Sequence, residues 1–266
     1  MNRSPTHQNT YSAQNLTARE TTIGHNYHHT PLMIWISIAF FMLAGCDFSS
    51  SASEIIGSGS QPKSDAVNND AAPLTDTGLT ILFLGDSLTE GYDLFPEQSY
   101  PSLVGEHFKA DGKKVTIVNA GISGDTTLGG LNRFKWYLEN KPYSVNILFL
   151  ALGANDGLRG LPLATAYQNL REIIVLAKKN NIKVVLAGIE VPPNYGKEYT
   201  ANFRNIYNSL QNEYSLTRMP FLLKDVAGIA ELNLEDGIHP NAEGYIIIAK
   251  NVYATLKPVV EANLSQ

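Results

Sequence analysis

The stretch FLGDSLTEGY, residues 83–92, decides how the chain is interpreted, because an apolar run turns polar directly after Gly85. Aspartate and serine commonly cap the start of a helix. A serine at a sharp turn from strand to helix is also where α/β hydrolases expose a nucleophile. We therefore expect a buried strand that ends here and leads into a helix. Whether Ser87 caps that helix or attacks a substrate depends on the rest of the sequence.

From this stretch to the C-terminus, apolar runs alternate with amphipathic segments. Four runs are typical of buried parallel strands, namely LTILFLG, KVTIVNA, VNILFLAL and IKVVLAGI, at residues 79–85, 114–120, 145–152 and 182–189. Helical periodicity is clearest over residues 162–179, and a last helix places apolar side chains from Tyr245 to Leu256 on one face. The alternation predicts one doubly wound, flavodoxin-like α/β domain in three layers, with a parallel sheet of about five strands.

The chain before this domain carries the features of an export signal. PLMIWISIAFFML, residues 31–43, has 13 residues, fewer than the ~20 of a membrane-spanning helix and within the range of a signal-peptide core. It runs into LAGC, residues 43–46, which resembles the lipobox of bacterial lipoproteins, in which the cysteine is lipidated and becomes the mature N-terminus. Asp47 resembles an inner-membrane retention signal of some bacteria. The alternative is that Cys46 merely ends an apolar run.

These features divide the chain into three parts. Residues 1–46 are the signal segment, residues 47–77 are a flexible linker rich in Ser, Gly and Asp, and residues 78–262 are the α/β domain. We expect the protein to be exported to the periplasm and lipid-anchored to a bacterial membrane through Cys46.

Composition argues against several classes of function. The formal net charge is −5 and the Lys and Arg residues are scattered, so the sequence offers no basic surface for nucleic acid. The single cysteine cannot form an intrachain disulfide. His25, His28 and His29 precede the apolar run and should leave with it, and the remaining sequence has no Cys and His cluster at metal-ligand spacing. We expect a monomer without metal or cofactor.

Polar residues follow all four predicted strands. The first strand ends at Gly85, Asp86 and Ser87, and the others lead into NAGISGD, GAND and EVPPNYG. In open α/β sheets, ligands bind at the carboxyl ends of the strands. The predicted site therefore lies at this edge of the sheet.

An acyl-transfer site also needs a base near the nucleophile, and two histidines follow residue 46. His107 lies among apolar residues of an amphipathic segment and is expected to be a partly buried structural histidine. His239 lies in the polar sequence EDGIHPNAEG, where Asp236 is close enough to hydrogen-bond its imidazole as a triad carboxylate does. By itself this spacing is also consistent with an aspartate that only stabilises the turn.

The combination of these motifs resembles the SGNH hydrolases, also called the GDSL family of esterases and lipases, over nearly all of residues 79–260. The likeness rests on GDSL at residues 85–88, on NAGISGDT and GANDGLRG, and on DGIHPN. GANDGLRG and PNYG add a likeness to the family's bacterial periplasmic thioesterases, lysophospholipases and arylesterases. GDSL is not the GxSxG elbow, so the usual α/β-hydrolase topology is not expected.

The resemblance implies a role for each of five residues. Ser87 would be the nucleophile, His239 the base and Asp236 its partner, and the oxyanion hole would consist of the Ser87 amide, the Gly124 amide and the Asn155 side chain. Elementary chemistry agrees, because a glycine lets a backbone N–H approach a substrate closely and a neutral amide can donate to a developing oxyanion. Asp86, Asp125 and Asp156 have no histidine close in sequence and are expected to hydrogen-bond turns and loops.

The expected function is a serine esterase or thioesterase acting on small acyl esters of short to medium chain length. Aryl esters, acyl thioesters and lysophospholipids are the substrate classes considered. An apolar wall for the acyl chain is expected from loops after the third and fourth strands, formed by Leu158, Leu161, Val191, Pro192, Pro193 and Tyr195. The alternatives are a carbohydrate O-acetylesterase on the same fold, a flavodoxin-like FMN-binding module and a non-catalytic lipid-anchored binding protein.

Overall fold

The structure is a computed structural model that describes residues 78–142 and 144–265. The predicted signal segment, Cys46, Asp47 and the linker lie outside these residues, so the predictions made for them concern a part of the chain that the structure does not describe. None of the helices between residues 78 and 265 is long and apolar enough to cross a membrane.

The centre of the fold is a parallel sheet of five strands in the order β2-β1-β3-β4-β5. The strands are β1 Leu79–Gly85, β2 Val115–Gly121, β3 Ile147–Ala151, β4 Lys183–Ala187 and β5 Thr217–Met219. The chain moves outward from β1 to β2 and then crosses back over β1 to β3, which is the flavodoxin-like order. The predicted fold class and the four predicted strands are therefore confirmed.

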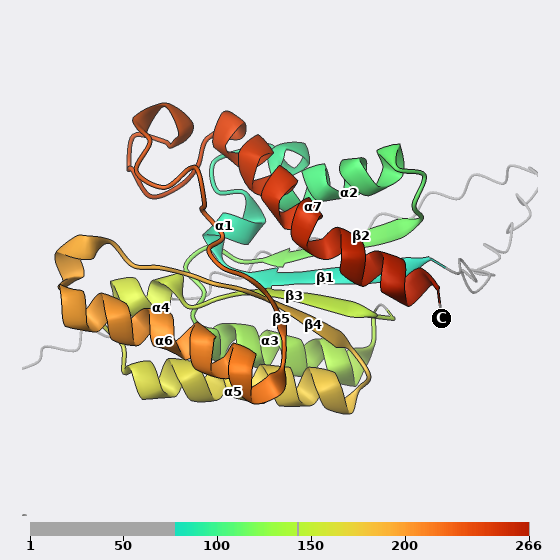
Figure 1. The fold of residues 1–266 in the computed structure, drawn as a ribbon, viewed down its shortest axis with the longest axis horizontal. Helices are drawn as coiled ribbons and strands as arrows, with labels where there is room; N and C mark the ends of the chain where they lie inside the picture. The colour runs from blue at the N-terminus through green and yellow to red at the C-terminus, as the bar shows by residue number, and fades with distance from the viewer. Residues whose placement is uncertain (1–77, 143, 266) are drawn as a thin grey trace, which may run out of the picture. The chain divides into compact units, whose positions relative to one another are not determined.

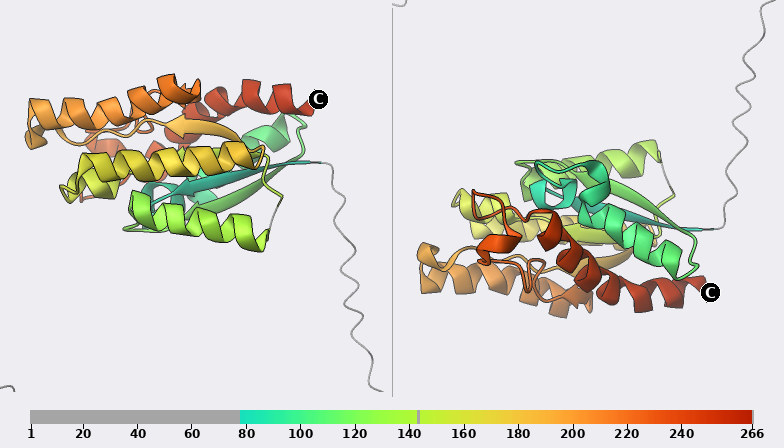
Figure 2. Two further views of the ribbon diagram at one scale, coloured as in Figure 1. Left: turned by 90° about the horizontal axis from the view of Figure 1, so that it is seen from below. Right: turned by 90° about the horizontal axis from the view of Figure 1, so that it is seen from above.

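Helices cover both faces of this sheet and make the three predicted layers. Figures 1 and 2 show α2 and α7 on one face and α3, α5 and α6 side by side on the other. The helices are α1 Ser87–Glu90, α2 Tyr100–Ala110, α3 Thr127–Asn140, α4 Ala154–Leu158, α5 Leu163–Lys179, α6 Lys197–Tyr214 and α7 Ala242–Leu264. Short 3-10 turns are η1 Pro96–Gln98, η2 Pro193–Tyr195 and η3 Ala230–Leu232.

The core lies along the two central strands. All five side chains of β3 are buried, as are six of the seven residues of β1, because a parallel sheet between two helical layers has no solvent face. The rings of Phe83, Tyr100 and Phe149 pack against one another with centroids 5.3 to 6.0 Å apart. This packing fixes the end of β1, from which the FLGDSLTEGY stretch continues.

The two helices predicted from periodicity are also present. The first, α5, begins after Pro162, which occupies the N-cap position. The second, α7, buries Tyr245, Ile248, Ala249, Val252 and Leu256 on the predicted face. Between β5 and α7 the chain takes a long, mostly irregular path, which Figure 1 shows near the carboxyl edge of the sheet. That path brings the predicted base toward the predicted nucleophile.

Candidate active site

Ser87 is the first residue of α1 and directly follows β1 through Gly85 and Asp86. The Asp86 side chain caps this short helix, since its Oδ1 accepts a hydrogen bond from the Leu88 N–H at 3.1 Å. A Cβ on Gly85 would lie 1.9 Å from Thr89 Oγ1, so only glycine allows the turn to close this tightly. Because Asp86 provides the cap, the hydroxyl of Ser87 is free for another partner.

That partner is His239, whose Nε2 lies 2.9 Å from Ser87 Oγ. On the other side of the imidazole, Nδ1 lies 2.6 Å from Oδ2 of Asp236. The second oxygen of Asp236 accepts the backbone N–H groups of Ile238 and His239 at 2.9 and 3.0 Å. The structure therefore brings together the three predicted triad residues in one continuous series of hydrogen bonds.

The hydrogen bonds also determine the charge of Asp236. Partial burial by itself would raise the pKa of this carboxyl, but the hydrogen bonds from the His239 backbone, the His239 ring and the Ile238 backbone outweigh it and hold the pKa below its usual range. Asp236 is therefore ionised at neutral pH. An anionic partner at Nδ1 favours the tautomer that leaves Nε2 free to accept a proton from Ser87.

An aromatic ring that was not predicted from the sequence packs on one face of the imidazole. The ring of Tyr92 stacks on the ring of His239 with centroids 4.3 Å apart and an interplanar angle of 28°. Tyr92 ends the FLGDSLTEGY stretch, two residues after α1. The same short segment thus carries the nucleophile and a contact that orients the base.

The predicted oxyanion donors lie on the loop after β2 and on α4. Gly124 has φ +77°, a conformation that favours glycine. Among residues 78–142 and 144–265, no hydrogen bond uses its N–H. The Asn155 amide nitrogen donates to the Asp125 carbonyl at 3.0 Å and has a second N–H. Ser87, Gly124 and Asn155 line the same cavity, so the structure also brings these three predicted residues together.

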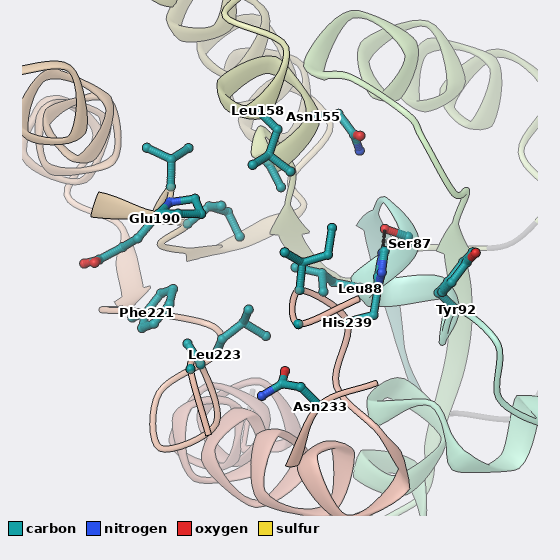
Figure 3. Close-up of a pocket in the computed structure, with 18 of the residues that line it drawn as sticks. Ser87, Leu88, Tyr92, Asn155, Leu158, Glu190, Phe221, Leu223, Asn233 and His239 are labelled. Carbon is teal, nitrogen blue, oxygen red and sulfur yellow. Dashed lines mark hydrogen bonds between the residues drawn. The ribbon is translucent and has the colours of Figure 1, made fainter. Parts of the chain in front are cut away.

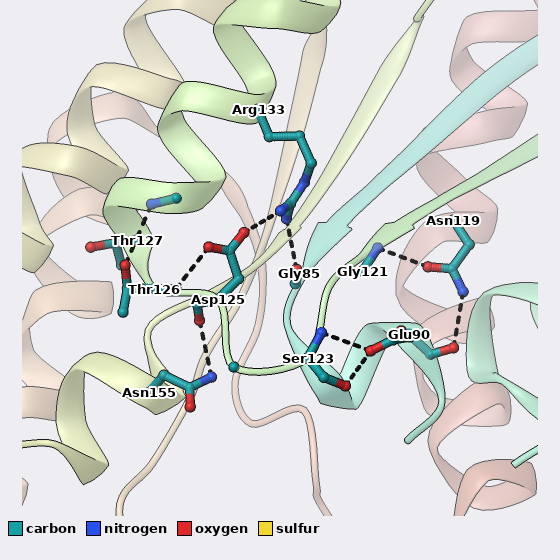
Figure 4. A network of polar contacts seen from close by, with 12 residues as sticks. Gly85, Glu90, Asn119, Gly121, Ser123, Asp125, Thr126, Thr127, Arg133 and Asn155 are labelled. Atoms are coloured by element: carbon teal, nitrogen blue, oxygen red, sulfur yellow. Dashed lines mark hydrogen bonds and ion pairs between the residues drawn. The ribbon is translucent and has the colours of Figure 1, made fainter. Parts of the chain in front are cut away.

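Charged side chains tie the loop of residues 122–126 to its neighbours, as Figure 4 shows. Glu90, from the nucleophile helix, accepts hydrogen bonds from the Ser123 N–H at 2.7 Å and from the Ser123 hydroxyl. Asp125 forms an ion pair with Arg133 of α3, and Arg133 also donates to the Gly85 carbonyl at 2.9 Å. These contacts connect the loop of residues 122–126, which carries Gly124, with both α1 and the end of β1.

The remaining acids near the site have structural partners, as expected. Asp156 accepts the Thr127 N–H at 2.8 Å and the Thr127 hydroxyl at 2.6 Å, which joins α4 to the start of α3. Asp86 is fully buried, and its Oδ2 has no partner in the described part of the chain. Burial raises the pKa of Asp86 to about 7, and the nearby charges of Asp125 and Asp156 add to this effect, although backbone hydrogen bonds oppose it.

A cavity of about 560 Å³ opens beside Ser87 and His239. Figure 3 shows the Ser87 to His239 hydrogen bond at one side and apolar side chains over much of the rest. Of the predicted wall, Leu158, Val191, Pro192 and Pro193 line the cavity. A second wall comes from the chain after β5, and it consists of Phe221, Leu223, Ala227, Gly228, Asn233 and Ile238. This wall was not predictable from the sequence, because the segment shows neither strand nor helix periodicity.

Three predicted placements need correction. Tyr195 does not line the cavity, because its hydroxyl donates to the Leu158 carbonyl at 3.0 Å and its ring stacks on Tyr199. Leu161 also lies outside the lining, beyond the end of α4, with 37% of its surface exposed. His107 is exposed on α2 rather than partly buried, and its ring packs against Tyr253.

Comparisons with known proteins give a consistent result. Residues 83–247 match the model of the GDSL-like Lipase/Acylhydrolase family. An arylesterase of Vibrio mimicus is 41% identical over 172 residues, which cover 65% of this chain and 85% of that protein. The thioesterase 1/protease 1/lysophospholipase L1 of Escherichia coli strain K12 is 36% identical over 181 residues, with coverage of 68% and 85%. The crystal structure of TesA has a TM-score of 0.65 at 36% identity and covers 68% of this chain and 99% of that one.

Proposed function

The chain belongs to the GDSL-like lipase/acylhydrolase family and is a serine esterase or thioesterase, and on this basis we propose that Ser87, His239 and Asp236 carry out its reaction. The observation that carries the proposal is the hydrogen-bonded series from Asp236 through His239 to Ser87 at the wall of a largely apolar cavity. Nucleophile, base and orienting carboxylate are the parts that acyl transfer requires.

The reaction proceeds in two halves. As Ser87 Oγ attacks the substrate carbonyl, His239 Nε2 takes the hydroxyl proton and Asp236 stabilises the imidazolium that forms. The carbonyl oxygen becomes negative and accepts hydrogen bonds from the Ser87 and Gly124 N–H groups and the Asn155 amide. The intermediate collapses to an acyl-enzyme on Ser87, and His239 protonates the departing alcohol or thiol. Water then attacks the acyl-enzyme, with His239 again acting as the base.

The proposed substrates are acyl esters and thioesters of short to medium chain length, including aryl esters and lysophospholipids. The cavity supports this class, because Leu158, Val191, Phe221 and Leu223 offer an apolar surface next to the nucleophile. The names of the relatives, an arylesterase and a thioesterase 1/protease 1/lysophospholipase L1, add support. An acetylated sugar, the alternative substrate, would leave most of this apolar surface without a partner.

An acyl-length series tests the proposal. We expect p-nitrophenyl esters from acetate to laurate to show rising kcat/KM from acetate to a medium chain, and matched thioesters to be cleaved as well. Ser87→Ala and a serine-directed phosphonate should each abolish turnover. A preference for acetate over every longer chain would favour the carbohydrate acetylesterase, and undiminished turnover by Ser87→Ala would exclude Ser87 as the nucleophile.

The location of the enzyme is part of the proposal. We infer that residues 1–46 direct export, that Cys46 is lipidated, and that residues 47–77 connect a periplasmic, monomeric domain to the membrane. The support is the length of the apolar run at residues 31–43 and the lipobox-like LAGC at its end. Asp47 favours the inner membrane as the site of attachment.

A further inference from the structure

We propose that Arg159 is a positioning residue of the oxyanion hole, which orients and polarises the Asn155 amide and restrains Gly124. The inference rests on the proposed function, since it assigns a purpose to the two donors named there. Arg159 immediately follows α4, one turn after Asn155, and its own N–H donates to the Asn155 backbone carbonyl at 3.1 Å.

The guanidinium reaches two oxygen atoms with one nitrogen. Arg159 Nη2 lies 2.9 Å from the Gly124 carbonyl oxygen and 3.3 Å from Oδ1 of Asn155. Both acceptors belong to residues whose N–H groups line the candidate oxyanion hole. Among residues 78–142 and 144–265, Arg159 has no carboxylate partner, although its side chain is exposed. In the described part of the chain, the Arg159 side chain thus has these two hydrogen bonds and no ion pair, so its effect should fall on Gly124 and Asn155.

The first effect is on the orientation of the Asn155 amide. A guanidinium only donates hydrogen bonds, so the atom of Asn155 that faces it must be the oxygen. The nitrogen then faces the Asp125 carbonyl, to which it donates at 3.0 Å. A flipped amide would set its NH2 group against the guanidinium and its oxygen against a carbonyl oxygen. Arg159 and Asp125 therefore select the same orientation, which leaves the second N–H available to the oxyanion.

The second effect is electronic. The guanidinium carries a permanent positive charge, and its hydrogen bond to the amide oxygen draws electron density away from the amide nitrogen. The N–H groups of Asn155 become better donors, because hydrogen bonds in a series polarise one another. The other arginine near this loop, Arg133, is paired with Asp125. Arg159 is therefore the unpaired positive charge beside the two donors in the described part of the chain.

The third effect is on Gly124. This residue has φ +77° and no side chain. A Cβ placed on it would meet a single neighbouring atom within 4 Å, Arg159 Nη2 at 3.4 Å. The hydrogen bond from Arg159 to its carbonyl thus restrains Gly124, in addition to the contact that Glu90 makes with the neighbouring Ser123.

The test is the steady-state kinetics of Arg159→Met on a p-nitrophenyl ester. Methionine keeps an unbranched, flexible stem but lacks the guanidinium, so both hydrogen bonds are lost. We expect kcat to fall about tenfold with KM nearly unchanged, a smaller loss than the ~10²–10³ caused by removing an oxyanion donor itself. Arg159→Lys keeps the charge but not the planar guanidinium, so its kcat should lie between that of the wild type and that of Arg159→Met. Equal losses in kcat and affinity, or wild-type kcat in Arg159→Met, would overturn the proposal.

A double variant separates positioning from general support of the loop. If Arg159 acts mainly through Asn155, adding Arg159→Met to Asn155→Ala should lower kcat by less than about threefold further, because the amide that it orients is already gone. A further loss of about threefold or more would overturn this part of the proposal. Arg159→Met should melt close to the wild type, since Arg159 is exposed.

Two controls complete the design. Arg171→Met removes another exposed arginine, which pairs with Glu213 on α6 and does not line the cavity, and its kcat should equal that of the wild type. Phosphonate labelling of Ser87 tests the proposed function separately. If Ser87→Ala is active or the phosphonate labels another residue, the proposed function fails. If labelling and Ser87→Ala behave as expected while Arg159→Met has wild-type kcat, only the present inference fails.

Discussion

Asp86 and Ser87 are neighbours at the end of β1 with opposite surroundings. Asp86 is fully buried, and one of its carboxylate oxygens caps α1. Ser87 instead directs its hydroxyl to His239. The cost of burying Asp86 is visible in its pKa, which burial raises to about 7. The nucleophile is thus set in place by an acid that is itself in an unfavourable environment.

Asp86→Asn should change how stability depends on pH. Asparagine keeps the capping oxygen but cannot ionise. In the wild type the pKa of Asp86 is near 3.8 when unfolded and about 7 when folded, so between these values the folded state holds an extra proton, and raising the pH destabilises it. We expect the free energy of unfolding of the wild type, relative to Asp86→Asn, to fall on the order of 4 kcal/mol as the pH rises from 4 through the folded-state pKa to about 8, and to stay level above. Urea unfolding at several pH values measures it, and parallel curves for the two proteins would contradict it.

Asn155→Ala tests the donor that Arg159 is proposed to orient. One N–H of Asn155 donates to the Asp125 carbonyl and the other is available to the oxyanion. Because the second bond strengthens only as charge develops, truncation should lower kcat by about 10²–10³, or roughly 2.7–4 kcal/mol, and barely change KM. If Asn155 only braces Asp125, the variant should instead melt lower and lose affinity and turnover together. Ser87→Ala sets the floor of activity in the same assay.

At the scale of elements, α1 depends on its neighbours, because a helix of four residues is not stable alone. The Tyr245 hydroxyl of α7 donates to the Leu88 carbonyl at 2.9 Å. The Thr89 hydroxyl lies 2.8 Å from the Tyr100 hydroxyl of α2, and Asn119 of β2 donates to the Thr89 carbonyl at 2.9 Å. Three separate elements therefore hold the helix that carries Ser87.

Tyr245→Phe should reveal the contribution of α7 to this arrangement. The substitution keeps the buried ring and leaves the buried Leu88 carbonyl without its donor. We therefore expect the free energy of unfolding to fall by about 1–3 kcal/mol. We also expect a lower kcat, since Ser87 is the neighbour of Leu88 in the chain. Tyr253→Phe is the matched control on the same helix, because its hydroxyl bonds Asp111 at the surface, and it should change stability by less than about 0.5 kcal/mol. Equal effects of the two variants would show that the Tyr245 hydroxyl does not support α1.

The elements also show which features the sequence could predict. β1 and β3 were predictable because a strand buried on both faces has a continuous apolar run, and α5 because Leu170, Ile174 and Ala177 repeat at helical spacing. β5 was not identified, since Thr217–Met219 has three residues and only one buried side chain. The geometry of Asp236 and His239 was predictable because the pair is three residues apart. The contact of Glu90 with Ser123 spans 33 residues, and no local pattern indicates it.

At the scale of the whole molecule, the described residues begin at one edge of the sheet, and the candidate active site lies at the opposite edge. Residue 78 directly precedes β1, and α1, which begins with Ser87, follows the carboxyl end of this strand. Figure 1 shows α1 at that end of β1. The chain that precedes the domain therefore joins it on the side away from the cavity.

Cys46→Ser tests the proposed anchor. If Cys46 is lipidated, the full-length wild type should incorporate labelled palmitate and sediment with membranes after cell lysis, and Cys46→Ser should do neither. The kcat of the isolated variant should equal that of the wild type, because the proposed catalytic residues all lie between residues 87 and 239. Ser87→Ala is the complementary control, since it should be labelled and sediment normally while lacking activity. Equal palmitate incorporation by the wild type and Cys46→Ser would show that the apolar run at residues 31–43 ends in an ordinary cysteine, and membrane association would then need another cause.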